Sequence, residues 1–293
     1  MRTSLIILGS LQMISFFEDH LATISFEKGD VAFAERKLNI IPRDSLPNEI
    51  IRNDLKKFYD EYDVDGTFVL FDSGKKEYSF YNKALFKQPS TPASTFNVLF
   101  TLIGLQEGII KDENSTIKPG KANLDSGYNK NLTLKTAFAE NYESFFRQMI
   151  KQISTERIRY WLDKINYGNK NTEGHANDFW LGESLQITPE EQLNFIRKFY
   201  YEDLPFSKQY FQLVKKMMRD KDSAGYKVFG KRGSYKIISQ NKYIGWFVGY
   251  VETKNNTYFF VNFIQSSNLN HRRLVDAQKE IVYKIFEFLG IVN

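Results

Sequence analysis

The chain has 293 residues, of which 42% are apolar and 26% charged, as is usual for a globular protein with a sizeable core. Its 40 basic and 35 acidic residues give a net charge of +5, but they are interspersed, so we expect no nucleic-acid partner. Cysteine is absent, which excludes disulfides, a thiolate nucleophile and sulfur metal ligands. His20, His175 and His271 lie far apart in the sequence, so we expect neither a metal site nor a cofactor.

The first 17 residues combine a charged start with a short apolar run from Ser4 to Phe17. This length is typical of a signal peptide and is too short for a stable membrane anchor. Gln12 interrupts the run and no small-residue cleavage site follows, so a first helix or strand of the fold is the alternative. We predict export to the periplasm or the medium. Residues 18–50 form a lead-in whose structure and role the sequence leaves open.

The domain that we predict over residues 51–293 begins with a helix and a hairpin. Leu55, Phe58 and Tyr62 recur at helical spacing. Residues 64–72 and 77–81 then have the composition of strands, and the segment between them contains a glycine and predicts a turn.

Residues 94–214 are typical of helices. Thr155 and Thr188 each open a helix that we expect to have a hydroxyl N-cap, and Pro189 follows in the second. The second helix carries an apolar face that we interpret as packing, formed by Leu193, Ile196, Phe199 and Tyr200.

The last part of the chain predicts strands again, followed by a closing helix. The strands are expected at residues 226–229, 235–238, 243–252 and 257–264, and the helix at 274–289 with Gly290 as its cap. Strands at both ends of a helical middle predict an α+β fold, in which helices and a helical subdomain flank one antiparallel sheet.

Ser94 precedes a strongly apolar helix at residues 98–103. Free backbone N–H groups and the helix dipole favour a developing anion there, which suits the nucleophile of an acyl transfer. A serine in this place is also a common N-cap, so the position alone leaves both interpretations open.

Seven sequence blocks between residues 54 and 291 together resemble the class D (oxacillinase-type) β-lactamases, a family that includes the sensor domains of β-lactam receptors. The blocks occur in the family's order and near its spacing. They are Asp65–Leu70, Pro92–Phe96, Asn131–Ala137, Tyr167–Asn169, Phe179–Leu181, Lys231–Gly233 and Gly245–Glu252. The resemblance implies a penicilloyl-serine transferase or β-lactamase-like fold.

The resemblance implies that Ser94 is the nucleophile of an S-x-x-K motif, whose carboxylated lysine is the general base of the family. Asn97 stands where that lysine is expected. An amide does not accept a proton near neutral pH, so we predict that catalysis is lost or strongly reduced.

The family's second motif, S-x-V, supplies a serine that relays a proton. Asn141 occupies the serine position and can still bind a ligand by hydrogen bonds, but it cannot relay a proton as a hydroxyl does. Glu143 stands at the valine position, and whether it replaces the missing base is left open.

The third motif, K-T/S-G, corresponds to Lys231, Arg232 and Gly233. Lys231 keeps the positive charge that attracts a carboxylate, and Gly233 lets a ligand approach the strand. Arg232 replaces a small hydroxyl residue that faces the ligand. Gln278 stands where the family has its carboxylate-binding arginine, so our hypothesis is that Arg232 crowds the cleft or binds an anion from another direction.

The remaining predicted site residues also follow from the resemblance. The backbone N–H groups of Ser94 and Ser234 are the expected oxyanion hole. Trp180 packs against the lysine in the family and is otherwise ordinary core. Tyr167 and Asn169 shape the wall of the cleft.

These observations favour a catalytically impaired protein that binds a β-lactam, a peptidoglycan fragment or another carboxylate ligand. One alternative is a weakly active serine β-lactamase or acyl-hydrolase, in which Glu143 or Lys231 activates Ser94. Another is a protein-binding module that keeps only the scaffold. The natural ligand and the oligomeric state are not determined by the sequence.

Overall fold

A computed structural model describes residues 6–8, 12–17, 20–25, 48–117, 132–173, 178–268 and 271–292. The chain divides into two compact units, residues 1–48 and 49–293. In the first unit, three short strands form an antiparallel sheet in the order β1-β2-β3. They are β1 (Ile6–Leu8), β2 (Gln12–Phe17) and β3 (His20–Ser25). The export signal over residues 1–17 stays a prediction.

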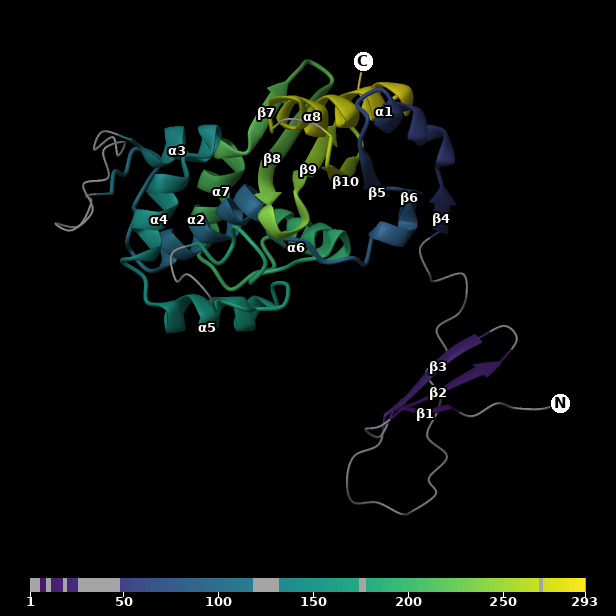
Figure 1. The fold of residues 1–293 in the computed structure, drawn as a ribbon, viewed down its shortest axis with the longest axis horizontal. Coiled ribbons are helices and arrows are strands. Elements are labelled where there is room, and N and C mark those ends of the chain that lie inside the picture. The colour runs from purple at the N-terminus through teal and green to yellow at the C-terminus, as the bar shows by residue number, and fades with distance from the viewer. Residues whose placement is uncertain are drawn as a thin grey trace, which may run out of the picture. The chain divides into compact units, whose positions relative to one another are not determined.

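The second unit is built around a seven-stranded sheet, in which strands from its two ends meet (Figure 1). The strand order is β4-β6-β5-β10-β9-β8-β7, and the pairings from β6 through β7 are antiparallel. The strands are β4 (Asn48–Ile51), β5 (Asp65–Asp72), β6 (Glu77–Tyr81), β7 (Arg219–Asp222), β8 (Tyr226–Ile237), β9 (Lys242–Thr253) and β10 (Thr257–Ser266). The hairpin predicted near the start of the domain is confirmed.

Strand β8 corrects the prediction of two separate strands at 226–229 and 235–238. The polar segment between Gly230 and Ser234 breaks the apolar alternation, yet every residue in it pairs with β9. The prediction of a strand relied on an apolar alternation, whereas the backbone of this segment pairs with β9 although that alternation is missing. Strand β7 was also missed, because its four residues, RDKD, are all charged and lie at the sheet edge.

Helices cover both faces of the sheet and extend beyond it as a helical subdomain (Figure 1). The short segment η2 (Asn53–Leu55) and helix α1 (Lys56–Asp60) precede the hairpin, and η3 (Lys83–Leu85) follows it. The middle holds η4 (Ala93–Phe96), α2 (Asn97–Gln106), α3 (Leu134–Glu140), α4 (Glu143–Ile150), α5 (Thr155–Ile165), α6 (Pro189–Tyr200) and α7 (Lys208–Met217). The segment η5 (Ile238–Gln240) and helix α8 (His271–Phe288) complete the unit.

The two faces of the sheet belong to two different hydrophobic clusters. Phe247 and Val251 of β9 pack in the cluster that contains Ile281 and Phe286 of α8. Trp246 and Val248, on the opposite face, belong to the larger cluster that contains helices α2, α4, α5 and α6. The alternation along β9 therefore tells which way the side chains of the paired strand β8 point.

The first residues and the caps of the helices match the predictions from the sequence only in part. Thr188 caps α6 in a full capping box with Glu191, and Pro189 is its first residue, as predicted. Helix α5 begins at Thr155 as predicted, but the capping hydroxyl belongs to Ser154. Helix α8 begins at His271, three residues before the predicted start, because its first turn is polar.

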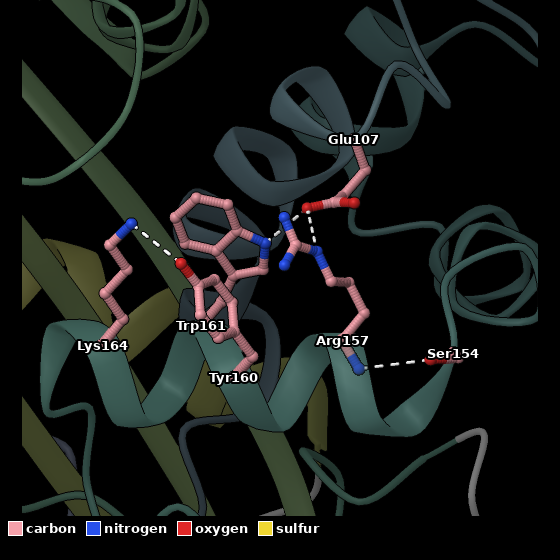
Figure 2. Close-up of polar contacts among 6 residues, drawn as sticks. All are labelled: Glu107, Ser154, Arg157, Tyr160, Trp161 and Lys164. Carbon is pink, nitrogen blue, oxygen red and sulfur yellow. Dashed lines mark hydrogen bonds and ion pairs between the residues drawn. The ribbon is translucent and has the colours of Figure 1, made fainter.

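Helix α5 is attached to α2 through one carboxylate (Figure 2). Glu107 Oε1 accepts hydrogen bonds from Arg157 Nε at 2.7 Å and from Trp161 Nε1 at 2.6 Å. Trp161 also stacks on Phe206 with ring centroids 4.7 Å apart. These contacts join α5 to the rest of the helical subdomain.

Within the described residues, no helix has the length and apolar character needed to cross a membrane.

Candidate active site

Ser94 lies in the 3-10 turn η4, which leads directly into the buried helix α2. Ala93, just before it, has a left-handed backbone with φ of 48°, a conformation that costs energy for a residue with a Cβ. Neither η4 nor α2 has a side-chain cap, so Ser94 is not the N-cap that its position allowed. Ser94 is partly exposed, whereas Thr95 and Phe96 are buried.

Hydrogen bonds hold the turn in place from behind. Thr95 Oγ1 donates to the carbonyl of Pro92 at 2.6 Å and accepts from Gln192 Nε2 of α6 at 2.7 Å. Gln192 was not predicted as a site residue, because in the sequence it belongs to an ordinary amphipathic helix.

Gly233 brings the backbone of β8 against this turn. A Cβ at Gly233 would lie 2.8 Å from Thr95 N, 3.0 Å from Ser94 N and 3.1 Å from Pro92 O. Such contacts are too short for any side chain, so only glycine fits. The nitrogens of Ser94 and Ser234 thus lie on two touching segments, as the predicted oxyanion hole requires.

Asn97 is the first residue of α2 and is only 2% exposed. Its Oδ1 has no hydrogen-bond partner among the described residues, and neither does Thr101 Oγ1 one helical turn later. Trp180 lies in the same aromatic core, 6.3 Å from the Phe96 ring and 5.8 Å from the Phe100 ring. The position expected to hold the base thus holds a buried neutral amide.

Lys231 of β8 and Asn141, the residue that ends α3, are joined by a hydrogen bond. Lys231 Nζ donates to Phe138 O at 2.6 Å and to Asn141 Oδ1. Lys231 is 4% exposed and forms no ion pair within the described residues. Burial, and secondarily the charge of Arg232, lower the pKa of Lys231 to about 7. An appreciable fraction of this amine is therefore neutral at physiological pH.

Glu143 is the first residue of α4, two positions after Asn141. Its carboxylate pairs with Arg147, and Arg147 also binds Asp178 at 2.9 Å. The carboxylate is thus held in an ion-pair network, and its role as a substitute base stays an open alternative.

Arg232 points to the other face of the sheet from Lys231. It pairs with Phe247, which faces α8, whereas Lys231 pairs with Val248, which faces the helical subdomain. Arg232 is half-buried and lines a cavity of about 110 Å³ at the strand edge together with Lys231 and Met218. Whether it binds an anion stays a hypothesis.

Gln278 lies under the same part of β8 and β9. It is 1% exposed, and its Nε2 donates to Val275 O at 3.1 Å. Its Oε1 faces Gly245, where a Cβ would lie 3.2 Å away, and Gly245 pairs with Ser234. A buried amide, Gln278, therefore occupies the position at which the resemblance predicts a carboxylate-binding arginine.

His271 is a residue that the sequence reading missed. Its Nε2 lies 3.0 Å from Ser234 Oγ, although 37 residues separate the two in sequence. The spacing of the two residues in the sequence did not predict this contact, because Ser234 of β8 and His271 of α8 come together only in the folded chain.

Tyr167 packs in the aromatic core that contains Phe96, and Asn169 follows it by two residues. The Tyr167 ring is 5.6 Å from Phe96, its hydroxyl is buried, and burial raises its pKa far above the usual range. The Asn169 side chain donates to Ser184 O at 2.7 Å and accepts from Gln186 N at 3.0 Å. Asn169 therefore fixes the loop that follows, and its ligand role stays a prediction.

No group of three or more metal-binding side chains occurs in the described part of the chain. His175, one of the three histidines, lies outside the described residues.

A family model, the penicillin-binding protein transpeptidase domain, matches residues 58–287. The chain belongs to this family. The predicted fold class, an α+β sheet flanked by helices, is confirmed by its solved relatives.

Known relatives place the chain among the class D β-lactamases and penicillin receptors. Probable β-lactamase YbxI of Bacillus subtilis is 35% identical over 224 residues, which are 75% of this chain and 83% of YbxI. The structure of a class D β-lactamase from Sebaldella termitidis matches with a TM-score of 0.76 and 31% identity, covering 84% of this chain and 100% of that chain. The predicted resemblance to class D β-lactamases is confirmed.

The third relative is a receptor rather than a β-lactamase. Regulatory protein BlaR1 of Bacillus licheniformis is 34% identical over 239 residues, which are 81% of this chain but only 39% of BlaR1. The structure of the C-terminal domain of this BlaR penicillin-receptor matches with a TM-score of 0.76 and 33% identity, over 84% of this chain and 98% of that domain. The chain thus spans less than half of BlaR1.

Proposed function

We propose that this protein binds β-lactams or chemically related carboxylate ligands at Ser94 and that it does not turn them over. The observation that carries the proposal is Asn97, a buried neutral amide at the position of the family's general base. When Ser94 attacks the strained β-lactam carbonyl, the amide bond of the ring breaks and the Ser94 proton passes to the ring nitrogen that leaves, so this step balances within the two reactants. Release of the acyl group instead requires a base that takes a proton from the attacking water. Without that base, an acyl group that reaches Ser94 stays there.

The geometry of the binding half of the site supports the proposal. Gly233 still lies against the backbone nitrogen of Ser94, which is the arrangement that an oxyanion hole needs. Lys231 still supplies a buried amine next to Asn141. The likeness to the BlaR penicillin-receptor domain supports ligand binding as the function of such a site.

A fluorescent penicillin and a chromogenic cephalosporin test the proposal. We expect the wild-type protein to be labelled by the penicillin, the Ser94→Ala variant to remain unlabelled, and the cephalosporin to remain unhydrolysed. Cephalosporin turnover that disappears in Ser94→Ala overturns the proposal.

A second function, slow hydrolysis at Ser94 with Lys231 as the base, is favoured by one observation. The lowered pKa of Lys231, about 7, leaves a neutral amine near neutral pH, and Lys231 shares a face of β8 with Gly233. In this case the wild-type protein would turn over the cephalosporin slowly, and Lys231→Met would abolish that turnover.

We also propose that the protein is exported, on the basis of the apolar run within residues 1–17. Fractionation of cells that express the full chain tests this, and protein found only in the cytoplasm overturns it.

A further inference from the structure

A cavity of about 390 Å³ lies between helix α6 and the segment that ends α5. Its α6 wall carries Asn194, Arg197 and Lys198, which recur at the spacing of one helix face, and Tyr201 at the end of the helix continues that face. Its lining includes neither Ser94 nor any residue of β8. The cavity is therefore separate from the cleft that the family motifs mark.

Arg197 is a half-buried cation in this wall that forms no ion pair within the described residues. Its Nη1 donates to the hydroxyl of Tyr78 at 3.1 Å, whereas its buried Nε has no hydrogen-bond partner among the residues that the structure describes. A partly desolvated cation without a counter-ion is unfavourable, and a bound anion would relieve that cost.

The hairpin β5–β6 holds the guanidinium of Arg197 in place. The carbon of the guanidinium lies 4.1 Å from the centroid of the Phe71 ring, and Phe71 pairs with Tyr78 across the two strands. These contacts fix the group without neutralising it, because a phenyl ring and a phenol carry no net charge. A cation that is already fixed loses less conformational entropy when it binds an anion.

The other charged side chains of the cavity leave the positive charge near Arg197 uncompensated. Lys198 is exposed and forms no ion pair within the described part of the chain. Glu191 precedes Arg197 by six residues, about 9 Å along the helix axis, and its carboxylate accepts hydrogen bonds from Thr188 in the capping box. Asp203 is exposed beyond the end of α6, where its carboxylate faces water.

We infer that this cavity is a second ligand site, which binds a small organic anion with an aromatic or aliphatic body. Arg197 would hold the carboxylate or sulfonate of the ligand through charge-assisted hydrogen bonds. The apolar body would be removed from water by the buried side chains of the lining, and the volume is within the range of small-molecule sites. These apolar residues are Ile165, Ile187, Phe195 and Leu204. The inference goes beyond the proposed function, because binding here requires no acylation of Ser94.

Two fluorescent probes test the role of the charge. Anilinonaphthalene sulfonate is an aromatic anion, and phenylnaphthylamine has the same rings without the sulfonate. We expect Arg197→Met to weaken binding of the anionic probe by about tenfold to a hundredfold and to leave binding of the neutral probe unchanged. Arg159→Met is the matched control, because Arg159 is an exposed arginine of α5 that does not line the cavity, and it should change neither affinity.

Asn194→Trp tests the location of the site without changing Arg197. Asn194 is exposed and lines the cavity, so an indole there fills space that the ligand needs. We expect this variant to lose binding of the anionic probe and to unfold in urea as the wild type does, and Asn194→Ala to keep binding. Unchanged affinity in Asn194→Trp, or an equal loss of both probes in Arg197→Met, overturns the inference. If Arg197→Met does not fold, Asn194→Trp decides.

Ser94→Ala distinguishes the two claims, because it should bind the anionic probe as the wild type does. Labelling of Ser94 by penicillin, together with probe binding that is unchanged in Asn194→Trp, leaves the proposed function standing and overturns this inference. Probe binding that depends on Arg197 and Asn194, in a protein that penicillin does not label, supports the inference and overturns the proposed function. Probe binding that disappears in Ser94→Ala overturns the inference, because it places the probe beside Ser94.

Discussion

The amine of Lys231 donates a hydrogen bond to the side-chain carbonyl of Asn141, a contact that spans 90 residues of sequence. The amine also donates to Phe138 O, so both of its hydrogen-bond acceptors are neutral. Within the described residues, Lys231 forms no ion pair with a carboxylate. The protein thus keeps a buried amine at Lys231, whereas a buried amide, Asn97, stands at the position of the family's base.

The buried amine predicts an unusual dependence of stability on pH. The pKa of Lys231 is about 7 in the folded protein and near 10.5 in the unfolded chain, so between these values the unfolded chain binds more protons. The free energy of unfolding should therefore rise with pH across this window, by at most about 1.4 kcal/mol per pH unit from this group. Urea denaturation at pH 7, 8 and 9 measures the slope.

The Lys231→Met variant should have a smaller slope than the wild type. Lys227→Met is the matched control, because Lys227 lies exposed on the same strand and should leave the slope unchanged. An identical slope in wild type and Lys231→Met contradicts the prediction.

Gly233→Ala should disturb the nucleophile turn. The added Cβ would lie 2.8 to 3.1 Å from three backbone atoms of residues 92–95, and backbone cannot move aside as a flexible side chain can. We expect a loss of about 1–3 kcal/mol of stability in urea denaturation, together with loss of labelling by fluorescent penicillin. Gly225→Ala serves as the control, because a Cβ there meets nothing within 4 Å, and its labelling should equal that of the wild type.

Asn97→Lys should restore hydrolysis if the missing base is the main defect. In added bicarbonate, which supplies the carbon dioxide for a carboxylated lysine, turnover of the chromogenic cephalosporin should rise by about a hundredfold or more. Asn97→Met has a similar reach without an amine and should show no such rise. If Asn97→Lys stays inactive although it is folded, then Asn141 or Arg232 also blocks catalysis.

The sequence predicted the scaffold well because its signals were local. The hairpin β5–β6 and the capping box of α6 depend on residues close together in the chain, and the structure confirms both. Strand β8 was split in the prediction because Lys231, Arg232 and Gly233 hide its apolar alternation, although pairing with β9 continues through them.

The site was predicted only where a family motif marked a position. Asn97 and Lys231 could be located in this way. The contact of Ser234 with His271, and that of Gln192 with Thr95, join segments that meet only in the folded chain, so no spacing rule could reveal them. The direction of Arg232 also needed the register of β8 against β9, which the sequence does not contain.

The time course of the intact mass after addition of one equivalent of benzylpenicillin is the decisive measurement of acylation without turnover. We predict that the mass increases by one benzylpenicillin, that the increase persists for hours, and that it is absent in Ser94→Ala. Return of the mass to that of the free protein within minutes, with release of hydrolysed penicillin, would show that Ser94 is deacylated and would contradict this prediction.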